Sequence, residues 1–162
     1  MAETLETTPL LVIRRVLLAI LLIGMVGTTI ELLLLKHVEE GTQLIPLVLL
    51  GFGLLVLAWH AARPGVASLM TVQITMVLFI AAGLIGIVLH YQANVEFQLE
   101  MDRSLSGMPL FWKAVAAKAP PALAPGSMAQ LGLIGLAYSY RYPTITAAHK
   151  GPPYRSDDHG GP

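Results

Sequence analysis

The feature that most constrains this chain is a long apolar segment that runs directly into a polar one. The apolar run VLFIAAGLIGIVL, at residues 77–89, is followed by HYQANVEFQLEMD, at residues 90–102, with no Gly or Pro break between them. The hydrophobic run ends at this junction, but no residue there would end a helix. We therefore predict a single helix from Ser68 to Asp102 that crosses a membrane and continues beyond it.

One stripe of this predicted helix carries small residues in its middle and polar residues at its outer end. The stripe follows from the rotation of 100° per residue in an α-helix. We expect the other helices of the protein to pack along it. Its members are Val72, Met76, Phe79, Gly83, Gly86, His90, Asn94, Phe97 and Met101.

The composition places the chain in lipid. Of its 162 residues, 55% are hydrophobic and 12% are charged, whereas roughly 25% of the residues of a typical soluble domain are charged. The apolar residues are gathered into four blocks instead of being spread at the intervals of a soluble core. We predict an all-α membrane protein with four transmembrane helices in an antiparallel bundle. The predicted spans cover about residues 12–35, 43–62, 68–91 and 126–142.

The predicted four-helix domain occupies residues 1–142, and it begins with a leader expected to be frayed over residues 1–11. The apolar run Val16–Leu35 is longer than the roughly 7–15 residues of a signal-peptide core, so we expect the first span to be retained. Residues 143–162 are rich in Pro, Gly and charge. They cannot bury enough apolar surface to offset their ordering entropy, which predicts a disordered tail.

The segment 96–121 is too long for a simple hairpin between the third and fourth spans. Leu110, Phe111 and Trp112 also make it too apolar to stand free in water. We expect this longer loop to be structured and to lie on the bundle as a lid, with Ser106 able to cap a short amphipathic helix. An exposed linker is the alternative that the pattern leaves open.

The basic residues orient the predicted bundle in its membrane. Four spans place both termini on one side, and positively charged residues favour the cytoplasmic side. We predict an inner-membrane protein of bacterial type with both termini in the cytoplasm. The terminal side would hold Arg14, Arg15, Arg63, Arg141, Lys150 and Arg155, and the opposite side Lys36, Arg103, Lys113 and Lys118.

Several classes of function are disfavoured. The absence of cysteine excludes disulfides, thiolate catalysis and iron–sulfur clusters, and a net charge of zero without a basic patch argues against nucleic acid as a partner. No zinc-protease helix, nucleophile elbow, phosphate loop or dinucleotide fingerprint is present. We expect no enzymatic activity and no cofactor, and we expect the bilayer and other membrane subunits, or further copies of the chain, as partners.

Six polar residues are expected to gather near the outer end of the bundle. Glu31 is the leading functional candidate, because a carboxylate at membrane depth must be protonated, hydrogen-bonded or in contact with water. Ordinary interhelical hydrogen bonds, worth roughly 0.6 kcal/mol on average, explain the same pattern. The predicted polar site consists of Thr28, Glu31, His90, Asn94, Ser127 and Gln130.

Haem or metal binding near His90 is a minor alternative. His37 is predicted on the same side of the membrane, but it lies just outside the first span beside Lys36, so a bis-histidine site would need it to turn inward. Glu96 and Glu100 are one helical turn apart and resemble half of a metal clamp. A solvated acidic face explains that pair equally well.

Glycines on spans one, three and four predict close helix packing. On span one, Gly24, Thr28 and Glu31 share a face that we expect to look into the bundle. On span four, Gly132 and Gly135 lie opposite Gln130, so one face can pack internally while the other meets a neighbour. We expect the face with Gly132 to be the one that meets a neighbouring molecule. The predicted packing glycines are Gly24, Gly27, Gly83, Gly86, Gly132 and Gly135.

The leading functional hypothesis is a small, non-catalytic membrane protein that acts as a subunit or assembly partner of a larger membrane complex, or as a homo-oligomer. The alternative is a carrier or channel for protons, cations or a small polar solute, with Glu31 as the titrating or coordinating group. Four short helices enclose little volume, so a transport pathway would require a dimer or larger assembly.

Overall fold

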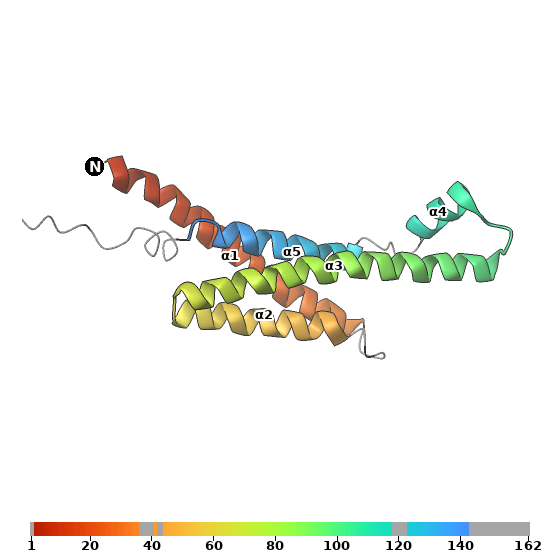
Figure 1. The fold of residues 1–162 in the computed structure, drawn as a ribbon, viewed down its shortest axis with the longest axis horizontal. Helices are drawn as coiled ribbons and strands as arrows, with labels where there is room; N and C mark the ends of the chain where they lie inside the picture. The colour runs from red at the N-terminus through yellow and green to blue at the C-terminus, as the bar shows by residue number, and fades with distance from the viewer. Residues whose placement is uncertain (1, 36–40, 42–43, 118–122, 143–162) are drawn as a thin grey trace, which may run out of the picture.

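The computed structural model describes residues 2–35, 41, 44–117 and 123–142, and its regular structure is all helical over these residues (Figure 1). The prediction of an all-α chain is thus confirmed for the described part. The predictions for Lys36, His37, Lys118 and the tail 143–162 concern residues outside that part. The helices are α1 (Ala2–Leu34), α2 (Leu44–Ala62), α3 (Val66–Met101), α4 (Gly107–Val115) and α5 (Leu123–Ser139).

Three of these helices are long and apolar enough to cross a membrane: α1 from Pro9 onward, α2 and α3. Each exceeds the roughly 17 residues that a transmembrane helix needs at minimum. Their length and composition indicate a membrane protein. The fifth helix, α5, has 17 residues and stands at the lower limit of that range.

The third helix runs without interruption from Val66 to Met101, as its sequence predicts. Its 36 residues correspond to about 54 Å, well beyond the roughly 30 Å hydrocarbon core of a bilayer. The predicted packing stripe is buried at Val72, Met76 and Phe79. At the far end of the helix the stripe is exposed, with Met101 73% accessible, because α5 covers only the first part of α3 (Figure 1).

The most extensive helix contact is between α3 and α5, where small residues let the two backbones approach each other. A Cβ on Gly132 would lie 2.5 Å from the carbonyl oxygen of Met76, and a Cβ on Gly83 would lie 2.6 Å from the backbone nitrogen of Ala129. Real Cβ atoms do not approach so closely. Glycine at these positions therefore permits the packing of α5 on α3.

The buried core is formed by α1, α2, α3 and α5 together. Met25 of α1 and Phe79 of α3 are fully buried, and both flank Gly53 of α2. The core also includes Leu21 of α1, Leu50 of α2, and Met128 and Leu131 of α5.

The first helix begins earlier than predicted. Residues 1–11 were expected to form a frayed leader, but α1 is helical from Ala2 and carries Pro9 within it. A proline lacks the N–H that would bond the carbonyl four residues before it. The first part of α1 therefore has one backbone hydrogen bond fewer than a regular helix. The helical periodicity continues into the leader because nothing else in it stops a helix.

The short helix α4 confirms the predicted structured segment after α3, but its position corrects the predicted lid. It packs against α3, and Figure 1 shows it beside the far end of α3, beyond the ends of α2 and α5. The physical reason is the length of α3: Met101 lies about 16 Å past His90 along the helix axis. The chain therefore turns back at Asp102 too far out to cover the bundle.

Candidate functional site

The six residues of the predicted polar site lie on three helices. Glu31 and Gln130 are exposed, and the other four are half-buried. The expected inward orientation of Glu31 is therefore wrong, although Gly24 and Thr28 on the same helix are half-buried. Thr28 and Glu31 belong to α1, His90 and Asn94 to α3, and Ser127 and Gln130 to α5.

Asn94 is tied to α4. Its side-chain amide donates a hydrogen bond of 3.1 Å to the carbonyl oxygen of Ala114, a fully buried residue of α4. One turn earlier on α3, the rings of Tyr91 and Phe111 lie 6.0 Å apart. These contacts hold α4 on the part of α3 that follows the apolar run, and they give Asn94 a structural role there.

The predicted packing glycines fall into two kinds. A Cβ on Gly24 would meet Leu131, and one on Gly86 would meet Pro125, while one on Gly135 would meet Met76. Together with Gly83 and Gly132, these glycines lie against neighbouring helices of the same chain. Gly27 differs, since a Cβ there would meet nothing within 4 Å.

The inference of a free glycine face on α5 is wrong. Gly132 and Gly135 both contact α3 through Met76, and both are buried. The face that was expected to be available to a neighbouring molecule is already occupied within the chain. The face that carries Gln130 is exposed.

At the opposite end of the bundle, the structure assembles a buried polar cluster that sequence reasoning missed. His60 of α2 is 2% exposed, and its Nδ1 lies 2.9 Å from Oγ of Ser68, across the turn between α2 and α3. Its ring contacts those of Tyr142 and Tyr138 at centroid distances of 5.0 and 6.5 Å. The imidazole thus joins the α2–α3 turn to the end of α5.

Ser68 connects His60 to the turn between α2 and α3. The Ser68 hydroxyl lies within donating distance of the carbonyls of Arg63 (3.0 Å) and Gly65 (3.1 Å), and it accepts a bond from the amide of Gly65. Its single proton serves one acceptor at a time, and the tautomer of His60 sets which way the bond between Nδ1 and the hydroxyl runs. Nε2 of His60 is buried without a hydrogen-bond partner among the described residues.

Beside this cluster, α1 and α5 form an open cleft of about 240 Å³. Arg14 crosses from α1 to the end of α5, where its Nη2 donates to the carbonyls of Tyr140 (3.1 Å) and Arg141 (2.6 Å). The same guanidinium lies 5.3 Å from the centre of the Tyr142 ring, in cation–π range. The cleft is lined by Leu11, Arg14, Arg15, Leu18, Tyr138 and Tyr142.

Two sequence signals point to this end of the bundle. His60 and Ser68 stand eight residues apart on either side of the Arg63–Gly65 turn, a spacing that brings them to the same level of a helical hairpin. The aromatic run YSYRY, at residues 138–142, ends α5 at the level of Arg14. The sequence places His60 only at the membrane boundary, because periodicity does not reveal which helix it faces.

The acidic pair Glu96 and Glu100 lies on the far part of α3. Both residues are exposed and line a wide, shallow hollow of about 500 Å³ together with Leu99 and Arg103. Within the described residues, no group of three His, Asp or Glu side chains is placed to hold a metal ion. A solvated face with Arg103 close by accounts for the pair.

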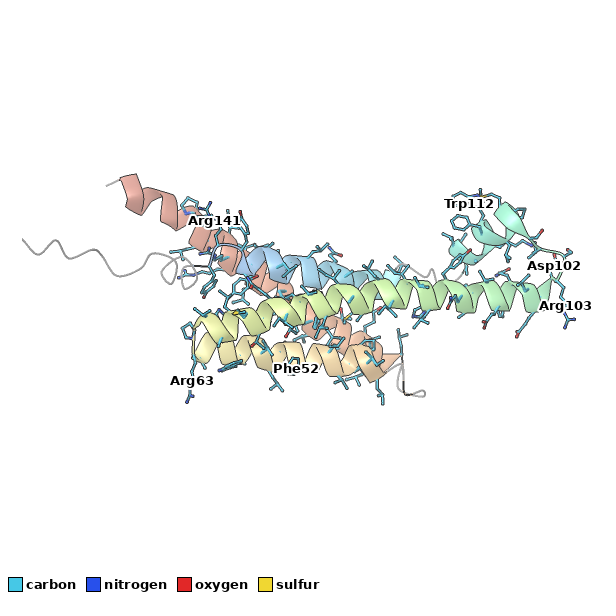
Figure 2. The ribbon with its side chains drawn as sticks, viewed as in Figure 1. Phe52, Arg63, Asp102, Arg103, Trp112 and Arg141 are labelled. Atoms are coloured by element: carbon cyan, nitrogen blue, oxygen red, sulfur yellow. The ribbon has the colours of Figure 1, made fainter. Side chains whose placement is uncertain are left out.

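Comparison with known protein families, curated proteins and solved structures finds no match for this chain. The indication that this is a membrane protein therefore comes from its own helices. Three of them are suited to crossing a bilayer, and charged side chains lie at both ends of the fold (Figure 2). Figure 2 shows these ends, with Arg63 and Arg141 at one and Asp102 and Arg103 at the other.

Proposed function

We propose that this chain is a small, non-catalytic, multi-pass membrane protein that serves as a subunit or assembly partner of a larger membrane complex. In this proposal α1, α2, α3 and α5 are four spans of an antiparallel bundle. The close packing of α5 along α3 supports a fourth span, although α5 is short. A helix of 17 residues can cross a bilayer when it stands nearly upright.

The observation that carries the assembly role is the part of the chain that leaves the bundle. We call it the α3–α4 arm, and it comprises α3 beyond Leu89 together with α4. Its two helices are held together, because Asn94 of α3 hydrogen-bonds α4 and the rings of Tyr91 and Phe111 are in contact. We infer that this projection lies outside the bilayer, where a partner subunit can reach it.

The surface of the arm carries several exposed apolar side chains. Exposed apolar side chains are expected on helices that face lipid, but these residues follow the apolar run of α3. Apolar groups gathered outside the hydrocarbon region favour contact with a protein or with the membrane surface. The exposed fractions are 57% for Phe97, 73% for Met101, 65% for Met108 and 60% for Trp112.

The orientation of the proposed bundle rests on its basic residues. Arg63 and Arg141 lie at the end of the fold opposite the arm (Figure 2), and Arg14 is bonded to that same end through Arg141. Cytoplasmic loops carry an excess of such residues. We propose an inner-membrane location with both termini in the cytoplasm and the arm on the outer side.

Site-specific photo-crosslinking in native membranes tests the assembly role. A photoreactive residue at Trp112 is expected to give a discrete protein adduct, whereas one at Leu55, which is 71% exposed on α2, is expected to give lipid adducts only. The adduct should disappear when Met108→Asp is added, because a buried unpaired charge opposes an apolar contact. Lys113→Gln on the same helix is the matched control and should leave the adduct intact.

Two outcomes would contradict the proposal. Lipid adducts alone at Trp112 would make α4 a membrane-surface helix without a protein partner. An adduct that survives Met108→Asp unchanged would place the contact elsewhere on the chain. An adduct that consists of two copies of this chain would identify the partner as a homo-oligomer.

A further inference from the structure

The cleft between α1 and α5 contains charges that are not balanced by the described residues around it. Its two cations are Arg14 and Arg15, and its other lining residues are leucines and tyrosines. Both arginines lie near the start of the apolar segment that begins at Pro9, on the side proposed to face the cytoplasm. Basic residues at such a membrane boundary attract anionic head groups.

The contacts of Arg14 use only some of the hydrogen-bond donors of its guanidinium group. Both of its hydrogen bonds to the end of α5 use Nη2, and the ring of Tyr142 packs against its face. These contacts hold the side chain in place and leave Nε and Nη1 without a hydrogen bond to the described residues. Arg15 is exposed next to it. The cleft thus presents fixed donors together with a second, adaptable cation.

We propose that this cleft binds the phosphate head group of an anionic phospholipid. Arg14 and Arg15 would hold the phosphate oxygens, since guanidinium groups form charge-assisted, often bidentate, hydrogen bonds with phosphate. The half-buried Tyr142 adds a further hydroxyl, whereas the buried Tyr138 already hydrogen-bonds with Tyr142. Basic pockets between transmembrane helices on the cytoplasmic side recognise lipid head groups through this chemistry.

The apolar part of the cleft favours a lipid over free phosphate. Leu11 and Leu18 line it on the same face of α1 as the two arginines. The neighbouring surface of α1 is apolar and exposed, with Val12 at 54% and Val16 at 51%. A phosphate held by the arginines would place the acyl chains of a lipid along this surface, whereas a free phosphate ion would leave it uncovered.

The experiment uses the full chain purified in a neutral detergent and measures bound lipid by native mass spectrometry. The probes are a phosphatidylglycerol and a phosphatidylcholine with the same acyl chains. We expect preferential retention of phosphatidylglycerol, and we expect Arg15→Gln to weaken it about tenfold, the loss that corresponds to one charge-assisted hydrogen bond. Arg63→Gln is the matched control, since it removes an exposed cation from the same end without touching the cleft.

A second variant, Arg14→Lys, keeps the charge but loses the planar donor geometry, and we expect it to weaken phosphatidylglycerol retention as well. Equal retention of the two lipids would overturn the proposal. A loss in Arg63→Gln as large as in Arg15→Gln would also overturn it, because the attraction would then be diffuse. Displacement of the lipid by millimolar inorganic phosphate would assign the cleft to a free anion. None of these outcomes depends on the α3–α4 arm, so this inference and the assembly role fail separately.

Discussion

Nδ1 of His60 and Oγ of Ser68 lie 2.9 Å apart, and their hydrogen bond closes the hairpin between α2 and α3. Ser68 also bonds the turn itself through the backbone of Gly65. The imidazole is thereby held against Tyr138 and Tyr142 at the end of α5. A single hydroxyl therefore links three helices of the bundle.

The first prediction concerns this hydroxyl. Ser68→Ala leaves Nδ1 of His60 buried without its hydrogen-bond partner, in addition to the unpartnered Nε2, and we expect a loss of about 1–3 kcal/mol of stability. The measurement is the thermal unfolding midpoint in detergent, followed by circular dichroism. Thr71→Ala is the control, because the Thr71 hydroxyl bonds only the carbonyl of Ala67 in its own helix. Equal midpoints for the two variants would remove the structural role assigned to the His60–Ser68 bond.

The second prediction separates two glycines that look alike in the sequence. Gly132→Ala places a Cβ against the backbone of Met76 and Ile80, which cannot move aside, so we expect a destabilisation of about 1–3 kcal/mol. Gly27→Ala meets nothing within 4 Å at an exposed helical position, so we expect a stabilisation of about 0.5–1 kcal/mol. Opposite signs in the shift of the unfolding midpoint are the expected result, and the same sign for both would contradict the packing of α5 on α3.

The helices could be predicted from the sequence because their signal is local. Hydrophobicity with a helical period indicates α3 without knowledge of its neighbours, and the absence of a stop signal carries the helix to Met101. The position of α4 could not be predicted in this way. It depends on the distance between Met101 and the bundle, which is set by the uninterrupted length of α3.

The candidate site was less predictable than the fold. The pattern on α1 placed Gly24, Thr28 and Glu31 on one face, but the crossing of α1 over α5 leaves only the first two half-buried. The cluster around His60 joins residues of α2, α3 and α5 that lie up to 82 positions apart in the chain. Contacts between helices are decided by side-chain packing, which residue spacing does not encode.

The third prediction is a pH dependence at the tip of the arm. The Ser104 hydroxyl and amide donate bonds of 2.6 and 3.0 Å to the Asp102 carboxylate, and these bonds, with a smaller contribution from the charge of Lys113, hold the pKa of Asp102 below its ordinary value. The turn after α3 is therefore fully stabilised above the unfolded-state pKa, and it loses that stabilisation as pH falls through the lowered folded-state pKa.

Nuclear magnetic resonance can measure this titration at the Ser104 amide. We expect its chemical shift to change with a midpoint below that of an ordinary aspartate, and we expect Asp102→Asn to abolish the change. Lys113→Met should move the midpoint slightly upward, because it removes a favourable charge. A midpoint at the ordinary value would show that the bonds from Ser104 do not persist in solution.

The last prediction distinguishes the assembly role from the carrier alternative. Glu31 is exposed near the end of α1. Within a single chain it therefore does not line an enclosed pathway for ions. We expect vesicles reconstituted with the purified protein to pass neither protons nor common monovalent cations above the level of empty vesicles. We also expect Glu31→Gln and Glu96→Gln to behave alike, since both change an exposed carboxylate. Flux that is present in the natural chain, lost in Glu31→Gln and retained in Glu96→Gln would assign transport to Glu31. Because four short helices enclose little volume, that result would also require a second copy of the chain to complete the pathway. Crosslinks between two copies through the exposed face of α1 would then locate the pathway at that face.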